Sequence, residues 1–171
     1  LSNEKRYNSD IESQQGEFNI IHQTADSTIM RGKVCYYRSQ RGLPGTVIFY
    51  TSPSTERLWD EDFFSQISLR KQLSPQRRME VRGKYTHSYN KYKNPREKQY
   101  DVDRQDEYYA SGTMLRQLTK TVQTALAEDI ALNTLRNNIN ANIETSPSNP
   151  IRFTSLTALT AQWKPERWEI Y

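Results

Sequence analysis

The residues best placed to do chemistry are the cations that crowd the segment from Arg70 to Lys98. Ten basic side chains stand there against two acidic ones, Glu80 and Glu97, so the segment carries +8 while the whole chain carries +4. A local charge of this size attracts phosphate groups or acidic protein surfaces. The candidate contacts for a polyanion or an acidic partner are Arg70, Lys71, Arg77, Arg78, Arg82, Lys84, Lys91, Lys93, Arg96 and Lys98.

Aromatic side chains are interleaved with these cations, an arrangement that suggests binding of single-stranded nucleic acid. Such binding needs stacking rings and phosphate-neutralising cations on one surface. The alternation of this segment places Tyr85, His87 and Tyr89 on one side of a strand and Arg82 and Lys84 on the other. We therefore expect these rings to pack within the protein. Because the sequence shows no recognised nucleic-acid motif, nucleic acid is a partner that we keep open but do not favour.

Residues for catalysis or metal binding are present, but their spacing favours neither. His22 and His87 fall in different predicted strands, and no serine lies in a nucleophile elbow. The acidic residues from Asp101 to Glu107 lack the glycine that a calcium loop requires, and capping of a helix explains them. Cys35, the one cysteine, is expected to be a buried, inert thiol. We predict that the chain is not an enzyme and holds no cofactor or metal.

Period-two alternation predicts the strands that must position these residues. It is strict from Met79 to Tyr89 and is seen again from Ile151 to Trp163. Shorter strands are expected at 18–22, 27–39, 46–51 and 167–171, with a turn at 40–45.

Two stretches instead show helical character. Residues from about 105 to 143 contain no proline and are rich in Leu, Ala, Gln, Arg and Glu, so we expect one long helix there. Its apolar stripe changes face near residues 129–133, which indicates a bend or two different neighbours. A shorter helix is expected at about 55–72, where spacings of three to five give an apolar face of Leu58, Trp59, Phe63, Phe64 and Ile67.

These elements predict an α+β fold, an antiparallel sheet of about five to six strands with the long and the short helix packed on it. We expect a polar N-terminal arm over residues 1–16 and one α+β domain over 17–171, with a basic connector around 91–104.

Composition points to a chain that needs partners. Only 35% of the residues are hydrophobic and the mean hydropathy is −0.94, low values for a self-sufficient globule, although 11% of the residues are aromatic. No apolar run reaches 18 residues, so we expect no membrane span in this chain. The sequence leaves open whether a membrane anchor precedes Leu1.

The leading hypothesis is a non-catalytic structural or assembly subunit of a larger complex, of the virion, phage-tail, secretion or envelope-machine type. Its partners would be other protein subunits, in a homo- or hetero-oligomer. The candidate interface residues are Leu132, Leu135, Ile139, Ile143, Trp168 and Tyr171. The alternative is a nucleic-acid or polyanion-binding module that uses the basic segment Arg70–Lys98.

Overall fold

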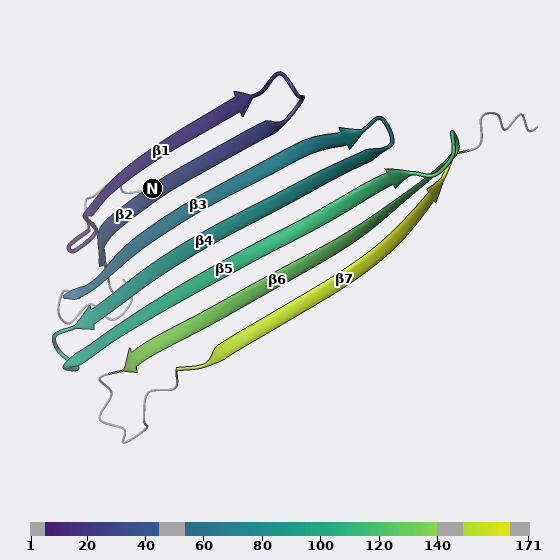
Figure 1. The fold of residues 1–171 in the computed structure, drawn as a ribbon. Helices are drawn as coiled ribbons and strands as arrows, with labels where there is room; N and C mark the ends of the chain where they lie inside the picture. Colours follow the sequence, from purple (N-terminus) through teal and green to yellow (C-terminus); the bar gives the residue numbers. More distant parts are fainter. Residues whose placement is uncertain (1–5, 45–53, 140–148, 165–171) are drawn as a thin grey trace, which may run out of the picture.

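The computed structural model is a single antiparallel sheet of seven strands, arranged in the order of the chain (Figure 1). The structure describes residues 6–44, 54–139 and 149–164. The strands are β1 (Ile11–Gln23), β2 (Ile29–Leu43), β3 (Glu56–Ser74), β4 (Arg77–Asn94), β5 (Gln99–Gln117), β6 (Val122–Ile139) and β7 (Ile151–Trp163).

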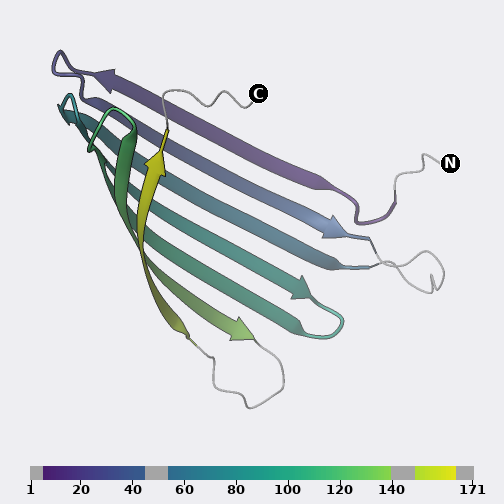
Figure 2. The ribbon, with the colours of Figure 1, turned by 90° about the vertical axis from the view of Figure 1, so that its right-hand side faces the viewer.

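The described residues form one layer, which curls along the β6–β7 side (Figure 2). Because nothing in the described chain covers either face, Val102 is the one hydrophobic side chain among these residues that is buried. The accessible surface is 13341 Å². A compact monomer of 20.1 kDa would expose about 8,700 Å². The fold therefore leaves uncovered much of the surface that a globular protein would bury.

The strand register sorts the side chains onto two faces, because residues directly opposite each other in an antiparallel pair point the same way. Tyr85 of β4 lies opposite Ser65 of β3 and Tyr108 of β5, and its neighbour Lys84 lies opposite Gln66 and Tyr109. We call the side of Tyr85 the apolar face and the side of Lys84 the polar face. The alternation predicted from Met79 to Tyr89 is thus confirmed.

The expected α+β fold is wrong, because the described residues contain seven strands and no helix. The segment expected as a long helix at 105–143 contains most of β5, a turn that starts after Gln117, and β6 up to Ile139. The change of face in its apolar stripe was a sign that no single helix runs through it. Good helix formers do not decide the structure where strand pairing on both sides outweighs propensity.

The short helix expected at 55–72 is also wrong, since β3 occupies 56–74. Its apolar residues Trp59, Phe63 and Ile67 recur every four positions. A spacing of four is close to one helical turn, but it is also a multiple of two and keeps all three side chains on one face of a strand. The polar residues between them, such as Asp60 and Gln66, face the other way.

The other predicted strands, the N-terminal arm and the basic connector agree only in part with the observed strand bounds. The strands predicted at 18–22, 27–39 and 151–163 lie in β1, β2 and β7, whereas those at 46–51 and 167–171 fall outside the described residues. β1 begins at Ile11, within the segment expected as an arm. The strands β4 and β5 extend into the expected basic connector, so that only residues 95–98 join them.

Candidate assembly site

No described residue pairs with the outer edge of β1, and all 13 residues of this strand are exposed. The amide of Gly42 donates to the carbonyl of Asp10, and that of Thr24 donates to the carbonyl of Thr28, so even-numbered backbone groups of this segment face β2. Because backbone direction alternates along a strand, the N–H and C=O groups at odd positions such as Ile21 face away from the sheet.

The outer edge of β7 has the same character. Its 13 residues are all exposed. The amide of Lys164 donates to the carbonyl of Thr121, and that of Leu135 donates to the carbonyl of Pro150, so even positions face β6. Odd positions such as Ser155 therefore point their backbone groups outward. The two long sides of the sheet are two templates for further strands.

The apolar face carries a continuous belt of side chains across the sheet. We define the apolar belt as the apolar-face side chains in the five rows that cross β4 at Met79, Val81, Gly83, Tyr85 and His87. An open trough of about 610 Å³ runs through its centre, lined by residues that include Phe18, Ile20, Val34, Ile67, Tyr108 and Leu132. Large apolar side chains remain exposed in the belt, with Ile67 at 56% and Phe153 at 66%.

Small and large side chains alternate across the central row of the belt. Gly32 stands between Ile20 and Ile67, and Gly83 stands between Ile67 and Ala110. A Cβ atom added at Gly32 would lie 2.9 Å from Cγ2 of Ile20, closer than carbon atoms pack, whereas one added at Gly83 would lie 3.6 Å from Cγ2 of Ile67, an ordinary contact. The glycine at position 32 therefore lets the isoleucine lie over it at the floor of the trough.

The carboxylates on the apolar face within the belt are satisfied by near neighbours. The hydroxyl of Tyr85 donates to Oδ1 of Asp106 at 2.8 Å, and Nδ1 of His87 lies 2.7 Å from the same oxygen. Sequence reasoning missed this pair, because it assigned Asp106 to a helix cap. Glu128 accepts hydrogen bonds from the hydroxyls of Ser155 and Thr157.

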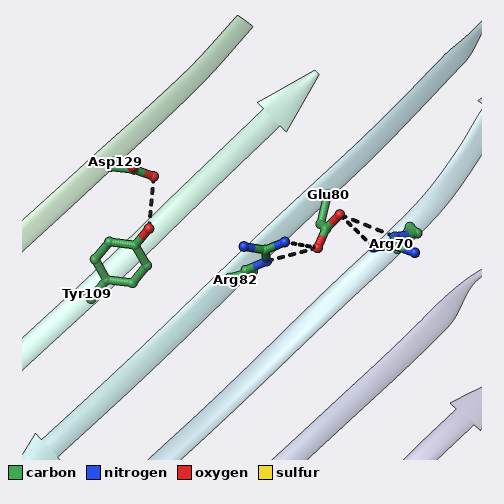
Figure 3. A network of polar contacts seen from close by, with 5 residues as sticks. All are labelled: Arg70, Glu80, Arg82, Tyr109 and Asp129. Atoms are coloured by element: carbon green, nitrogen blue, oxygen red, sulfur yellow. Dashed lines mark hydrogen bonds and ion pairs between the residues drawn. The ribbon is translucent and has the colours of Figure 1, made fainter. Parts of the chain in front are cut away.

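The polar face, in contrast, is held together by charge pairs (Figure 3). Glu80 lies between two arginines, accepting from Arg70 at 3.1 Å and from Arg82 at 2.6 Å. The hydroxyl of Tyr109 donates to Asp129 at 2.9 Å. The contacts of Glu80 with Arg70 and of Tyr109 with Asp129 span neighbouring strands, so they support the register as well as the solubility of this face.

The predicted polyanion contacts do not gather on one surface. The polar face receives Arg70, Arg78, Arg82 and Lys84, the apolar face receives Lys71, Arg77, Lys91 and Lys93, and Arg96 and Lys98 lie in the turn after β4.

Several of these cations already have partners. Lys84 pairs with Glu107, and Lys91 lies over the ring of Trp59 at 4.7 Å. Lys71 pairs with Asp26 at 3.1 Å. The hydroxyl of Thr24, together with Lys71, holds the pKa of the Asp26 carboxyl below its usual range.

The predicted interface residues are also separated by the strand geometry. Leu132 lies in the apolar belt, whereas Leu135 lies opposite Gln105 on the polar face, so the two do not share the surface that a helix would have given them. Ile139 is the last residue of β6. Ile143, Trp168 and Tyr171 lie outside the described residues.

Two pairs of arginines at the ends of the belt were not foreseen. Arg77 lies directly opposite Arg116 across β4 and β5, and Arg104 lies directly opposite Arg136 across β5 and β6. None of the four forms a salt bridge with a described carboxylate, although Arg104 lies over the ring of Tyr89 at 5.6 Å. The hydrogen bond with His87 lowers the pKa of Asp106, and the charge of Arg136 contributes to this shift. Like charges directly opposite each other destabilise a sheet unless an anion lies between them.

The described residues contain no group of three or more His, Cys, Asp or Glu side chains that could hold a metal ion. They also contain no helix long and apolar enough to cross a membrane. Cys35 is half-buried and not disulfide-bonded. No protein-family model and no curated protein matches this chain.

Proposed function

We propose that the chain is a non-catalytic structural subunit of a larger protein assembly, which it joins through the outer edges of β1 and β7. The observation that carries this proposal is the pair of open edges, each 13 residues long. Strands in globular proteins are usually about five or six residues long. An edge of twice that length offers a row of backbone donors and acceptors that a neighbouring strand can pair with.

The protective features that isolated sheets use at their edges are scarce here. Neither β1 nor β7 contains a proline, and the irregularity in the described pairing lies between β3 and β4, around Gln72 and Ser74. A bulge, a proline or a short strand at the edge is the usual means of preventing strand addition. The edges of this sheet are therefore suited to permanent pairing with other subunits, whether copies of the chain or different proteins.

An assembly of this kind would be part of a virion, a phage tail, or a secretion or envelope machine. In each case the chain would contribute part of a wall, since a single-layer sheet with two pairing edges can be extended by neighbours on both sides. No catalytic group is required for that role.

A polyanion-binding role for Arg70–Lys98 is the second candidate. It is supported by an open hollow of about 440 Å³ on the polar face, whose lining includes Arg31, Lys33, Arg70 and Arg82 together with Glu80. The split of the ten cations between two faces weighs against it. Binding to a polyanion should weaken steeply as salt rises, and salt-independent association would instead favour the structural role.

Light scattering on the purified chain in a mild detergent, with protein mass separated from detergent mass, tests the leading proposal. We expect a multiple of 20.1 kDa. Ile21→Pro and Ser155→Pro each remove one outward-facing amide donor and leave the pairing with β2 and β6 in place, so each should lower the assembled mass. Ile21→Ala and Ser155→Ala keep the donor and should assemble normally. A wild-type chain of single-copy mass under all these conditions would contradict the proposal.

A further inference from the structure

The length of the apolar belt along the strands limits which kinds of partner can cover it. From Met79 to His87 the belt spans eight residues of extended chain, or about 27 Å. Two neighbouring rows of the belt, those of Gly83 and Tyr85, contain no carboxylate and no cation. The two carboxylates of the belt, Asp106 and Glu128, lie outside these rows and are hydrogen-bonded to neighbours. The belt's cation, Lys71, lies in the row of Met79 and is paired with Asp26.

The rows immediately beyond the belt are cationic at both ends. The opposed arginines Arg77 and Arg116 lie at one end, and the opposed arginines Arg104 and Arg136 lie at the other, in the row of Tyr89. Twelve residues separate these rows on β4, which corresponds to about 40 Å along the strand. A phospholipid bilayer has a hydrocarbon core about 30 Å thick and measures about 40–45 Å with its headgroups.

From this match we propose that the apolar face contacts the acyl chains of a phospholipid bilayer, with the strands crossing the hydrocarbon layer close to the bilayer normal and the arginine pairs at its two headgroup levels. Phosphate groups there would lie between arginines that the described chain leaves facing each other. The polar face, with its charge pairs, would be turned away from lipid.

A second copy of the chain is a poorer occupant of this face. Packed face to face in either direction, two copies would bring cationic rows against cationic rows at both ends of the belt, and like charges across an interface are unfavourable. Lipid headgroups, in contrast, supply anionic phosphate at both levels.

This inference rests on the proposed function, because unpaired strand edges are not tolerated in hydrocarbon and neighbouring subunits must pair with β1 and β7. It also changes the expectation that the chain has no membrane span. That expectation used the length of apolar runs, and an alternating strand gives only every second side chain to lipid, so it contains no such run.

Spin labels attached along β3 can test the proposal. In a Cys35→Ser background, single cysteines are placed in turn at each position from 63 to 69, and the labelled chain is reconstituted into vesicles of phosphatidylcholine and phosphatidylglycerol. We expect labels at odd positions such as Ser65 and Ile67 to be several-fold more accessible to oxygen, which dissolves in lipid, than to a water-soluble nickel reagent. Labels at Gln66 and Ser68 should not show this preference.

Two other results would overturn the proposal. If the odd positions are immobile and inaccessible to both reagents, another protein or a second copy covers the face. If they are open to the nickel reagent, the face is in water. Neither result depends on the mass of the particle. Odd positions open to water in an assembled particle would reject lipid contact and leave the assembly role standing, whereas a chain of single-copy mass would reject the assembly role itself.

The arginine pairs give an independent readout with a matched control. Arg77→Gln with Arg116→Gln should lower co-flotation with phosphatidylglycerol vesicles several-fold and change little with neutral vesicles. Arg77→Gln alone should also lower this co-flotation, whereas Arg78→Gln, which removes the same single charge one residue away on the polar face, should not. Equal losses for the two single variants would contradict the placement of the arginine pairs at the headgroups.

Discussion

The two faces of the sheet share one backbone, but they differ in how far contacts within the chain satisfy their side chains. On the polar face, carboxylates meet cations across strands, as Glu80 of β4 meets Arg70 of β3 and Glu107 of β5 meets Lys84 of β4. On the apolar face, Ile67, Phe153 and Leu159 remain more than half exposed. The comparison shows that water can be the natural neighbour of one face only, because exposed apolar area on this scale is a binding surface in soluble proteins.

The two faces also differ in their means of holding the register. Cross-strand charge pairs fix the polar face from within the chain. The apolar face has ring contacts, such as that between Tyr85 and Tyr108 with centroids 5.0 Å apart, and a fitted row of glycines and isoleucines. These contacts align the strands, but they do not cover the face.

The largest difference between the faces should come from a charge placed in the apolar belt. Ile130→Arg puts a cation in the central row, and in lipid this should cost about 2–4 kcal/mol of unfolding free energy. The matched control is Ala131→Arg, which places the same side chain beside Tyr109 on the polar face and should cost much less. Denaturant unfolding in vesicles measures both, and equal costs would remove the distinction between the faces.

A smaller effect is expected when the charge network of the polar face is broken. Glu80→Gln leaves Arg70 and Arg82 without their shared carboxylate, which should cost about 1 kcal/mol at low salt. The cost should shrink as ionic strength rises, because these side chains are partly exposed. A loss of stability that does not respond to salt would mean that Glu80 contributes through packing instead.

The smallest expected effect on stability comes from replacing two glycines of the belt with alanine. Gly32→Ala brings a methyl group against Ile20 and should destabilise the sheet by up to about 1 kcal/mol. Gly83→Ala meets only ordinary contact and should be neutral or stabilise by about 0.5 kcal/mol, since alanine restricts the unfolded chain. Thermal unfolding of the two variants under the same conditions compares them, and the reverse order would show that the row is packed differently.

The sequence predicted the sheet best where each residue followed a strict rule. From Met79 to Tyr89 the polar and apolar residues alternate without exception, and this strand is observed with both faces as expected. Ile151 to Trp163 was also predicted as a strand, because five of its seven odd positions are apolar. Local alternation is sufficient to assign a strand when no helical spacing competes with it.

In the two segments that were wrongly predicted as helices, a helical pattern competes with the strand pattern. In β3 the spacing of Trp59, Phe63 and Ile67 fits either structure, and in β5 and β6 residues such as Leu126 and Ala127 favour a helix in isolation. Pairing with neighbours on both sides decides the structure, and those neighbours are distant in sequence. That Arg77 lies directly opposite Arg116 could not be predicted for the same reason, since it depends on the register between two strands.

Amide hydrogen exchange on the assembled particle tests most directly whether neighbours complete this sheet. Within β1 and β7, even-numbered amides face the sheet and odd-numbered amides, such as those of Ile21 and Ser155, face outward. If neighbouring subunits pair with both edges, the odd amides should be protected as strongly as the even ones, and at the level of β4. Rapid exchange at the odd positions beside protected even positions would show that the edges are bare, and would contradict the account.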